Sequence, residues 1–119
     1  MLKRLMWISM MASLASACSS SWPEPRQPMV DAEAAARSAR ELGAGAQPAA
    51  QLQLTLAEEQ IAAAKGQIAK GENERATYLL IRARADAELA LALAHEQQAR
   101  EEMQRALGQS KPSTSGAQP

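Results

Sequence analysis

Apolar residues recur every three or four positions through the middle of this chain. Between about 48 and 70 they fall on Leu54, Ala57, Ile61, Ala64 and Ile68. Between about 74 and 107 they fall on Ala76, Leu80, Ala83, Ala87, Ala90 and Ala94. Alternating steps of three and four align side chains along one face of an α-helix. The pattern therefore predicts two amphipathic helices, over about 48–70 and 74–107.

The short connection around Gly71 predicts that these two helices form an antiparallel hairpin. Folding the sequence about residue 72 sets Ala64 opposite Leu80, and it sets Ile61 opposite Ala83. A large side chain then faces a small one at each level, as interdigitated packing requires. Asn73 is of the residue type that favours the N-cap of the second helix.

A shorter helix is expected over about 29–42. Its apolar face consists of Met29, Ala32, Ala36 and Ala39, and Glu33–Arg37 is a favourable pair four residues apart. Gly43 is suited to ending this helix, and Pro48 to the first turn of the next. The expected fold is all-α, an antiparallel hairpin with a short N-terminal helix, completed as a small three-helix bundle if that helix packs on the hairpin.

The segment Ala87–Ala94, AELALALA, carries a second apolar set, formed by Leu89, Leu91 and Leu93. These leucines cannot all lie on the hairpin seam. In one interpretation the N-terminal helix covers them. In the other they form a docking stripe for a second copy of the chain or for another protein.

Composition supports the helical prediction and argues against an enzyme. Of 119 residues, 27 are alanine, none is phenylalanine, and tryptophan and tyrosine together number three. Alanine with leucine, glutamate, glutamine and arginine favours helix, whereas so few aromatic residues cannot fill the core of an α/β enzyme. His95 is the single histidine and Cys18 the single cysteine, which gives no metal-ligand set and no catalytic pair. We expect no catalytic residues, no cofactor, no metal and no small-molecule substrate.

The first seventeen residues have the three-part pattern of a secretory signal peptide. Lys3 and Arg4 precede a ten-residue apolar run, Leu5–Leu14, and small residues follow. The run is too short to span a bilayer, which needs about 20 apolar residues. Outside this segment 11 basic residues stand against 13 acidic ones, so no basic excess suggests nucleic acid as a partner.

Cys18 follows the signal pattern directly, in the sequence LASAC. Cleavage between Ala17 and Cys18 would leave Cys18 as the first residue. LASAC resembles the lipobox of bacterial lipoproteins, although Ala15 stands where that motif prefers leucine. Lipidation would remove a lone thiol from an oxidising compartment, and several acyl chains would anchor the protein firmly. By the same resemblance, Ser19 after the cysteine points to the outer membrane, facing the periplasm. Ordinary cleavage, releasing a soluble secreted protein, remains the alternative.

The expected organisation is a signal peptide (1–17), a lipidated Cys18 with a Pro/Ser-rich tether (18–28), an Ala-rich helical domain (29–107) and a disordered tail (108–119). The tether has no apolar periodicity, and its prolines favour extended backbone. Trp22, within it, is either an aromatic anchor at the membrane interface or an exposed linker residue.

Residues about 29–100 resemble the bacterial family known as domain of unknown function 4398, small Ala-rich envelope proteins of which many are lipoproteins. The matching positions are Gly45-Ala46, Leu54, Ala57, Ile61, Ala64, Gly71, Ala76, Ala83, Ala85-Asp86-Ala87 and Leu89-Ala90. Gln51 and Leu80 depart from the pattern. The resemblance implies an envelope location and no chemistry. Some relatives carry a peptidoglycan-binding domain, so association with the cell wall is a further, weaker hypothesis. The leading expectation is a non-catalytic, lipid-anchored helical spacer, scaffold or adaptor.

Overall fold

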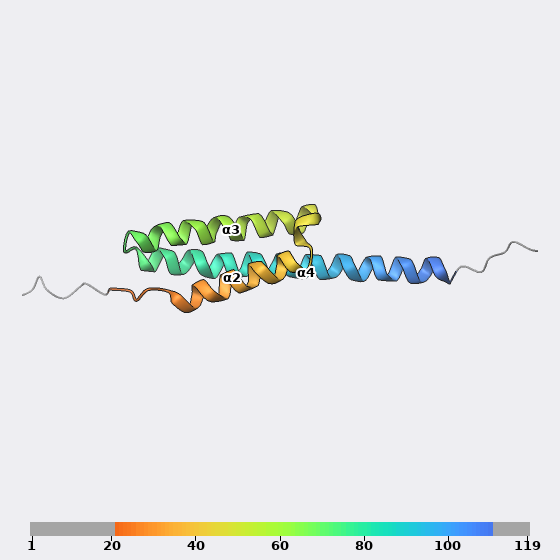
Figure 1. The fold of residues 1–119 in the computed structure, drawn as a ribbon, viewed down its shortest axis with the longest axis horizontal. Coiled ribbons are helices and arrows are strands. Elements are labelled where there is room, and N and C mark those ends of the chain that lie inside the picture. Colours follow the sequence, from red (N-terminus) through yellow and green to blue (C-terminus); the bar gives the residue numbers. More distant parts are fainter. Residues whose placement is uncertain (1–20, 111–119) are drawn as a thin grey trace, which may run out of the picture.

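The computed structural model describes residues 21–110, which form three α-helices and one short 3₁₀ turn. The elements are α2 (Arg26–Glu41), η1 (Ala44–Ala46), α3 (Pro48–Ala69) and α4 (Asn73–Gln109). Helices α3 and α4 lie side by side as a hairpin, and α2 lies along them (Figure 1). No strand occurs in this part of the chain. The predicted all-α hairpin with a short N-terminal helix is confirmed.

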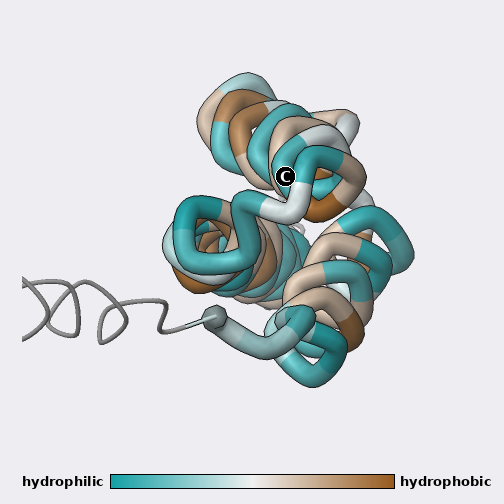
Figure 2. Tube along the Cα trace, turned by 90° about the vertical axis from the view of Figure 1, so that its left-hand side faces the viewer, coloured by the Kyte–Doolittle hydropathy of each residue, from teal (hydrophilic) through white to brown (hydrophobic). Residues whose placement is uncertain are grey.

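Helix α2 completes a three-helix bundle in which it runs parallel to α4 and antiparallel to α3. Arg84 of α4 pairs with Asp31 near the start of α2. Further along both helices, the Gln98 amide of α4 donates a hydrogen bond to the Leu42 carbonyl just after α2. Viewed along the bundle, the three helices form a triangle around a shared centre (Figure 2). The N-terminal helix therefore packs on the hairpin, which the sequence had left open.

The core at this centre is built almost entirely from alanine. Leu54, Ile61 and Leu80 are its only large buried side chains among the described residues, and Leu80 alone is wholly enclosed. The predicted seams supply most of the rest; the buried alanines are Ala32, Ala36, Ala39, Ala44, Ala50, Ala57, Ala64, Ala76, Ala83, Ala87, Ala90 and Ala94. Short side chains let helix backbones approach closely, but each buries little apolar area. The bundle is therefore tightly packed and modestly stabilised.

The ends of the helices differ from the sequence prediction in three places. Helix α4 continues to Gln109, so Gly108 and Gln109, which were assigned to the disordered tail, are helical. Helix α2 begins at Arg26 rather than near residue 29, because Pro28 lies in its first turn, where a backbone N–H has no helical partner in any case. The last three residues assigned to the tether are therefore helical. Asn73 does not cap α4; it is the first residue of the helix, and Glu72 holds the N-cap position without a side-chain cap bond.

Two glycines set the turns between helices, as predicted. Gly43 follows α2 with φ of 88°, and Gly71 separates α3 from α4 with φ of 76°. Both values lie in the left-handed region, where a side chain is unfavourable. Pro48 occupies the first position of α3.

Helix α4 is much longer than the helices it packs against. It has 37 residues and α3 has 22, which correspond to about 55 Å and about 33 Å at 1.5 Å per residue. Its C-terminal part projects beyond the bundle (Figure 1), and every residue from 98 to 110 is exposed. An isolated helix of this length is marginal in water, so the projecting part depends on continuity with the packed part.

Candidate functional site

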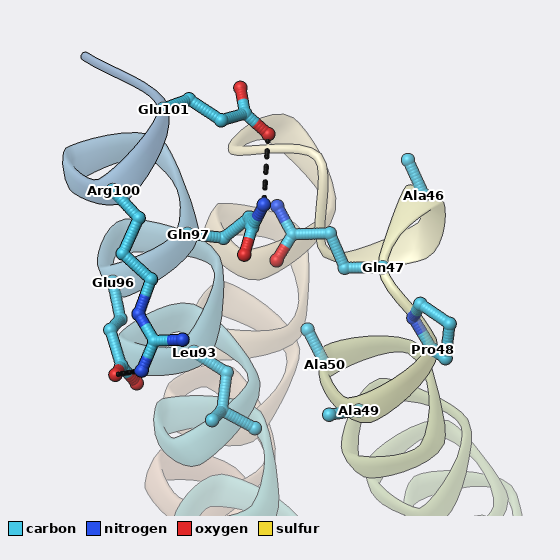
Figure 3. A pocket seen from close by; sticks show the side chains of 10 residues that line it. All are labelled: Ala46, Gln47, Pro48, Ala49, Ala50, Leu93, Glu96, Gln97, Arg100 and Glu101. Carbon is cyan, nitrogen blue, oxygen red and sulfur yellow. Dashed lines mark hydrogen bonds and ion pairs between the residues drawn. The ribbon is translucent and has the colours of Figure 1, made fainter. Parts of the chain in front are cut away.

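An open hollow on the described surface lies where α4 projects past the start of α3. It has a volume of about 510 Å³ and is open to solvent. Leu93 and Ala50 form its apolar floor, and Gln47 approaches the α4 side chains from the opposite wall (Figure 3). Its polar groups are engaged within α4, since Arg100 pairs with Glu96 at 2.5 Å and the Gln97 amide donates to Glu101 at 3.1 Å. No unpaired charged group is directed into the hollow to select a ligand.

One polar contact lies between α3 and α4 at the edge of the core. The Gln60 amide nitrogen donates a 2.6 Å hydrogen bond to a carboxylate oxygen of Asp86, and both residues are half-buried. The Gln60 amide oxygen is buried without a partner. Asp86 is the aspartate of the Ala-Asp-Ala motif, so the structure gives this position a packing role, fixing the register of the hairpin. No ion pair joins Asp86 to Arg82 in the part of the chain that the structure describes.

Ion pairs fasten α2 to the hairpin on both sides. On the α3 side Glu33 pairs with Lys65 at 2.7 Å, and Arg40 pairs with Glu58. On the α4 side Arg84 pairs with Asp31 at 3.4 Å. The predicted pair of Glu33 with Arg37 within α2 is not formed, because Glu33 pairs with Lys65 of α3 instead. All these pairs are exposed, so each contributes at most about 1 kcal/mol.

Arg84 is the one ionisable group in residues 21–110 whose pKa is clearly displaced. Its pKa is raised above the usual value by a 2.7 Å hydrogen bond to the Glu88 carboxylate, by the charge of Glu88 and by the charge of Asp31. The guanidinium is fully exposed and was already protonated at any physiological pH. The shift marks a surface charge network and not a catalytic acid or base.

Trp22 packs against the bundle at the turn between α3 and α4. Its ring lies 6.1 Å from that of Tyr78 at an interplanar angle of 49°, and its carbonyl accepts a 2.9 Å hydrogen bond from the Asn73 amide. Asn73 therefore holds the N-terminal segment instead of capping its own helix. Neither earlier interpretation of Trp22 included this contact. With 40% of its surface exposed, Trp22 belongs to the domain rather than to a free linker.

The three leucines predicted as one docking stripe do not share a surface. Leu91 and Leu93 are half-buried and pack against the core, whereas Leu89 is 46% exposed. Leu91 lies two residues from Leu89, a rotation of about 200°, and so it is on the opposite side of the helix. Leu93 lies four residues from Leu89 and on nearly the same side, but it is half-buried against the core. Leu89, Leu91 and Leu93 therefore do not form one exposed stripe.

A different exposed face runs along α4. Tyr78, Ile81, Leu89, Met103 and Leu107 are all exposed large apolar side chains of this helix. Sequence reasoning missed four of them because it followed the buried seam and one leucine-rich window. The sequence feature that indicates this face is a spacing of eleven residues, which is close to three helical turns. This spacing separates Tyr78 from Leu89 and Ala92 from Met103, and it places each pair on the same side of the helix.

Metal-binding and membrane-spanning features were also sought in residues 21–110. No three histidine, cysteine, aspartate or glutamate side chains come together there as a metal site would require. None of the helices in this range is long and apolar enough to cross a bilayer. Cys18, the signal segment and residues 111–119 of the predicted tail lie outside the described residues.

Comparison with known proteins places the chain in a family. No curated protein and no solved structure matches it. The family described as "Domain of unknown function (DUF4398)" matches residues 27–106, which is most of the chain and nearly all of the helical bundle. The described α2–α4 bundle is thus the family's domain in this protein. The chain belongs to the DUF4398 family.

Proposed function

We propose that this protein is a non-catalytic helical module of the bacterial cell envelope, anchored by lipid on Cys18. It acts through helix packing, as a spacer, scaffold or adaptor. The observation that carries the proposal is the lone Cys18, which follows a signal-like segment and precedes a small alanine-cored bundle. The proposed location is the periplasmic face of the outer membrane.

The position of Trp22 supports a bundle held close to the anchor. Only three residues separate Cys18 from Trp22, and Trp22 is fastened to Asn73 and Tyr78. A chain spans at most about 3.5 Å per residue, so Cys18 lies within ~14 Å of this fastened point. An anchor on Cys18 would therefore hold the α3–α4 turn near the bilayer surface.

The charge distribution supports a structural rather than a catalytic role. The carboxylates that lie within reach of a cation are paired on the surface, as in Glu33–Lys65 and Glu101–Arg105. General acid–base catalysis needs groups whose pKa values are shifted toward neutrality by burial or by like charges. The described residues with side-chain charge are not buried. The bundle instead presents exposed helix faces on which another protein could pack.

The Cys18→Ser variant tests the anchor in cells. We expect the wild-type chain in the membrane fraction and Cys18→Ser in the soluble periplasmic fraction, both with the same helical circular dichroism. Ser19→Ala is the matched control, because it alters the neighbouring residue and leaves the cysteine; it should stay with the membranes. Equal solubility of wild type and Cys18→Ser would refute lipid anchoring and favour the secreted form.

Cell-wall association remains a second candidate with less support. It predicts that the chain sediments with purified peptidoglycan in the absence of membranes. It rests on the resemblance of the chain to relatives that carry a peptidoglycan-binding domain. An adaptor role toward another envelope protein would show as specific cross-linking in cells.

A further inference from the structure

The exposed apolar face of α4 has the dimensions of a helix-packing surface. We define the α4 outer face as Tyr78, Ile81, Ala85, Leu89, Ala92, Glu96, Ala99, Met103 and Leu107, all exposed. At 100° per residue these positions fall within an arc of roughly 80°. The face lies opposite the buried seam of α4, and it extends over about 44 Å of helix. Neither α2 nor α3 covers it.

The order of side chains along this face is nearly palindromic about Ala92. Ile81 and Met103 each lie eleven residues from Ala92, and both are large and apolar. Ala85 and Ala99 each lie seven residues away and are both small. Tyr78 and Leu107 lie at the two ends, fourteen and fifteen residues away. A second identical helix that runs antiparallel across this face therefore brings apolar positions onto apolar positions along most of its length, with Leu89 and Glu96 as the exception.

We propose that two copies of this chain associate through the α4 outer face, antiparallel, with the two-fold axis near Ala92. The charge of Glu96 favours the antiparallel direction over the parallel one. A parallel pair in register would set Glu96 against Glu96 of the partner subunit at the centre of the contact, where like charges repel. The antiparallel pair sets Glu96 near the partner subunit's Leu89, and Glu96 keeps its own Arg100.

The projecting end of α4 gives independent support. Met103 and Leu107 lie on the part of α4 that projects beyond the bundle, where every described residue is exposed. In the antiparallel pair this part lies along the first turns of the partner's α4, where Tyr78 and Ile81 are exposed. The otherwise marginal helix thereby gains a packed face. Where each chain also carries the proposed lipid, the two anchors emerge at opposite ends of the pair, which favours a rod lying along the membrane.

The area available is that of a weak but specific dimer. Half the surface of five large side chains, together with the intervening alanines, amounts to roughly 500–600 Å² per copy at ~150–200 Å² for each whole side chain. The pair would bury about 1,000–1,200 Å², the lower end of specific interfaces. We therefore expect a dissociation constant in roughly the micromolar range. A lipid surface suits the face less well, because Glu96 interrupts it and Glu88 flanks it on one side.

Matched substitutions test whether this face is the contact. The full chain carrying Cys18→Ser is followed by sedimentation velocity from about 1 to 100 μM, across the range expected for an interface of this size. We expect a concentration-dependent dimer that Ile81→Lys weakens at least tenfold. Val30→Lys is the control, since Val30 is 58% exposed on α2 and Ile81 is 56% exposed on α4. A monomer at every concentration, or equal weakening by both variants, would overturn the proposal.

Single cysteines in the same Cys18→Ser chain test the direction. Under oxidation with diamide, Ala92→Cys should form a covalent dimer, whereas Ala62→Cys, exposed on α3, should not. A mixture of Ile81→Cys and Met103→Cys chains should give several-fold more mixed dimer than either homodimer. Predominant homodimers would establish a parallel pair and contradict the two-fold at Ala92. A monomeric chain whose binding to phosphatidylethanolamine–phosphatidylglycerol vesicles is lost in Ile81→Lys would assign the face to lipid instead.

Discussion

Leu80 is the side chain on which the stability of the bundle depends most. Among the described residues it is the only large side chain with no exposed surface, and its seam neighbours on α4, Ala76 and Ala83, are alanines. Replacing it with alanine removes the largest apolar group from a core that has few others. The neighbouring methyl groups cannot extend to fill the space that it leaves.

The expected cost of Leu80→Ala is about 3 kcal/mol, within the range found for fully buried leucines. A domain of some 90 residues has a total stability of roughly 5–13 kcal/mol, and an alanine core places this one toward the lower end. The variant should therefore lose a large part of the free energy of unfolding. For a domain of this size 3 kcal/mol corresponds to a fall in Tm of about 12–24 °C.

Thermal unfolding followed by circular dichroism at 222 nm measures this loss. Leu52→Ala is the matched control, because Leu52 is 58% exposed on the outer side of α3 and the chemical change is identical. It should alter the free energy of unfolding by less than about 0.5 kcal/mol. If Leu80→Ala and Leu52→Ala shift Tm equally, the core does not lie on the seam described here.

Three further predictions concern the turn, the polar contact and the close approach of the helices. Gly71→Ala should destabilise the domain by about 1 kcal/mol, because Gly71 has a positive φ that alanine adopts at a cost. Gly66→Ala should stabilise the domain by about 0.5–1 kcal/mol, because Gly66 lies within α3 with open space around it. Urea unfolding that gives the two changes in free energy the same sign would contradict this. Asp86→Ala should cost about 1–2 kcal/mol in the same assay, since it leaves the half-buried Gln60 amide without its acceptor, and a neutral result would remove the register role. Ala87→Leu should destabilise the domain by about 1–3 kcal/mol, because a wholly buried alanine leaves no room for a larger side chain. An unchanged Tm would show that the helices are not closely packed at Ala87.

The hairpin could be predicted from sequence because its signals are local. The three- and four-residue steps of the buried seams, Pro48 at a helix start and Gly71 at the turn each follow from the geometry of a single helix or turn. The packing of α2 was harder to predict, because an alanine face specifies no partner. Ion pairs with residues distant in sequence, such as Glu33 with Lys65, complete that contact.

The surface features were predicted less well, and for a physical reason. The separation of Leu91 from Leu89 follows from helix geometry alone, whereas the partial burial of Leu93 depends on how the bundle packs. Asn73 was expected to satisfy its own helix, but a nearby carbonyl, that of Trp22, accepts its hydrogen bond instead. The α4 outer face was visible in the sequence as an eleven-residue spacing, but its exposure depends on where α2 and α3 lie.

Mass spectrometry of the mature N-terminus tests the proposed function most directly. The full chain is expressed in a bacterial host with its own first seventeen residues and is purified from the membrane fraction. The proposal predicts a chain that begins at Cys18 and carries a diacylglyceryl group with an additional acyl chain. An unmodified Cys18 at the start of a chain recovered from the soluble periplasm would contradict it.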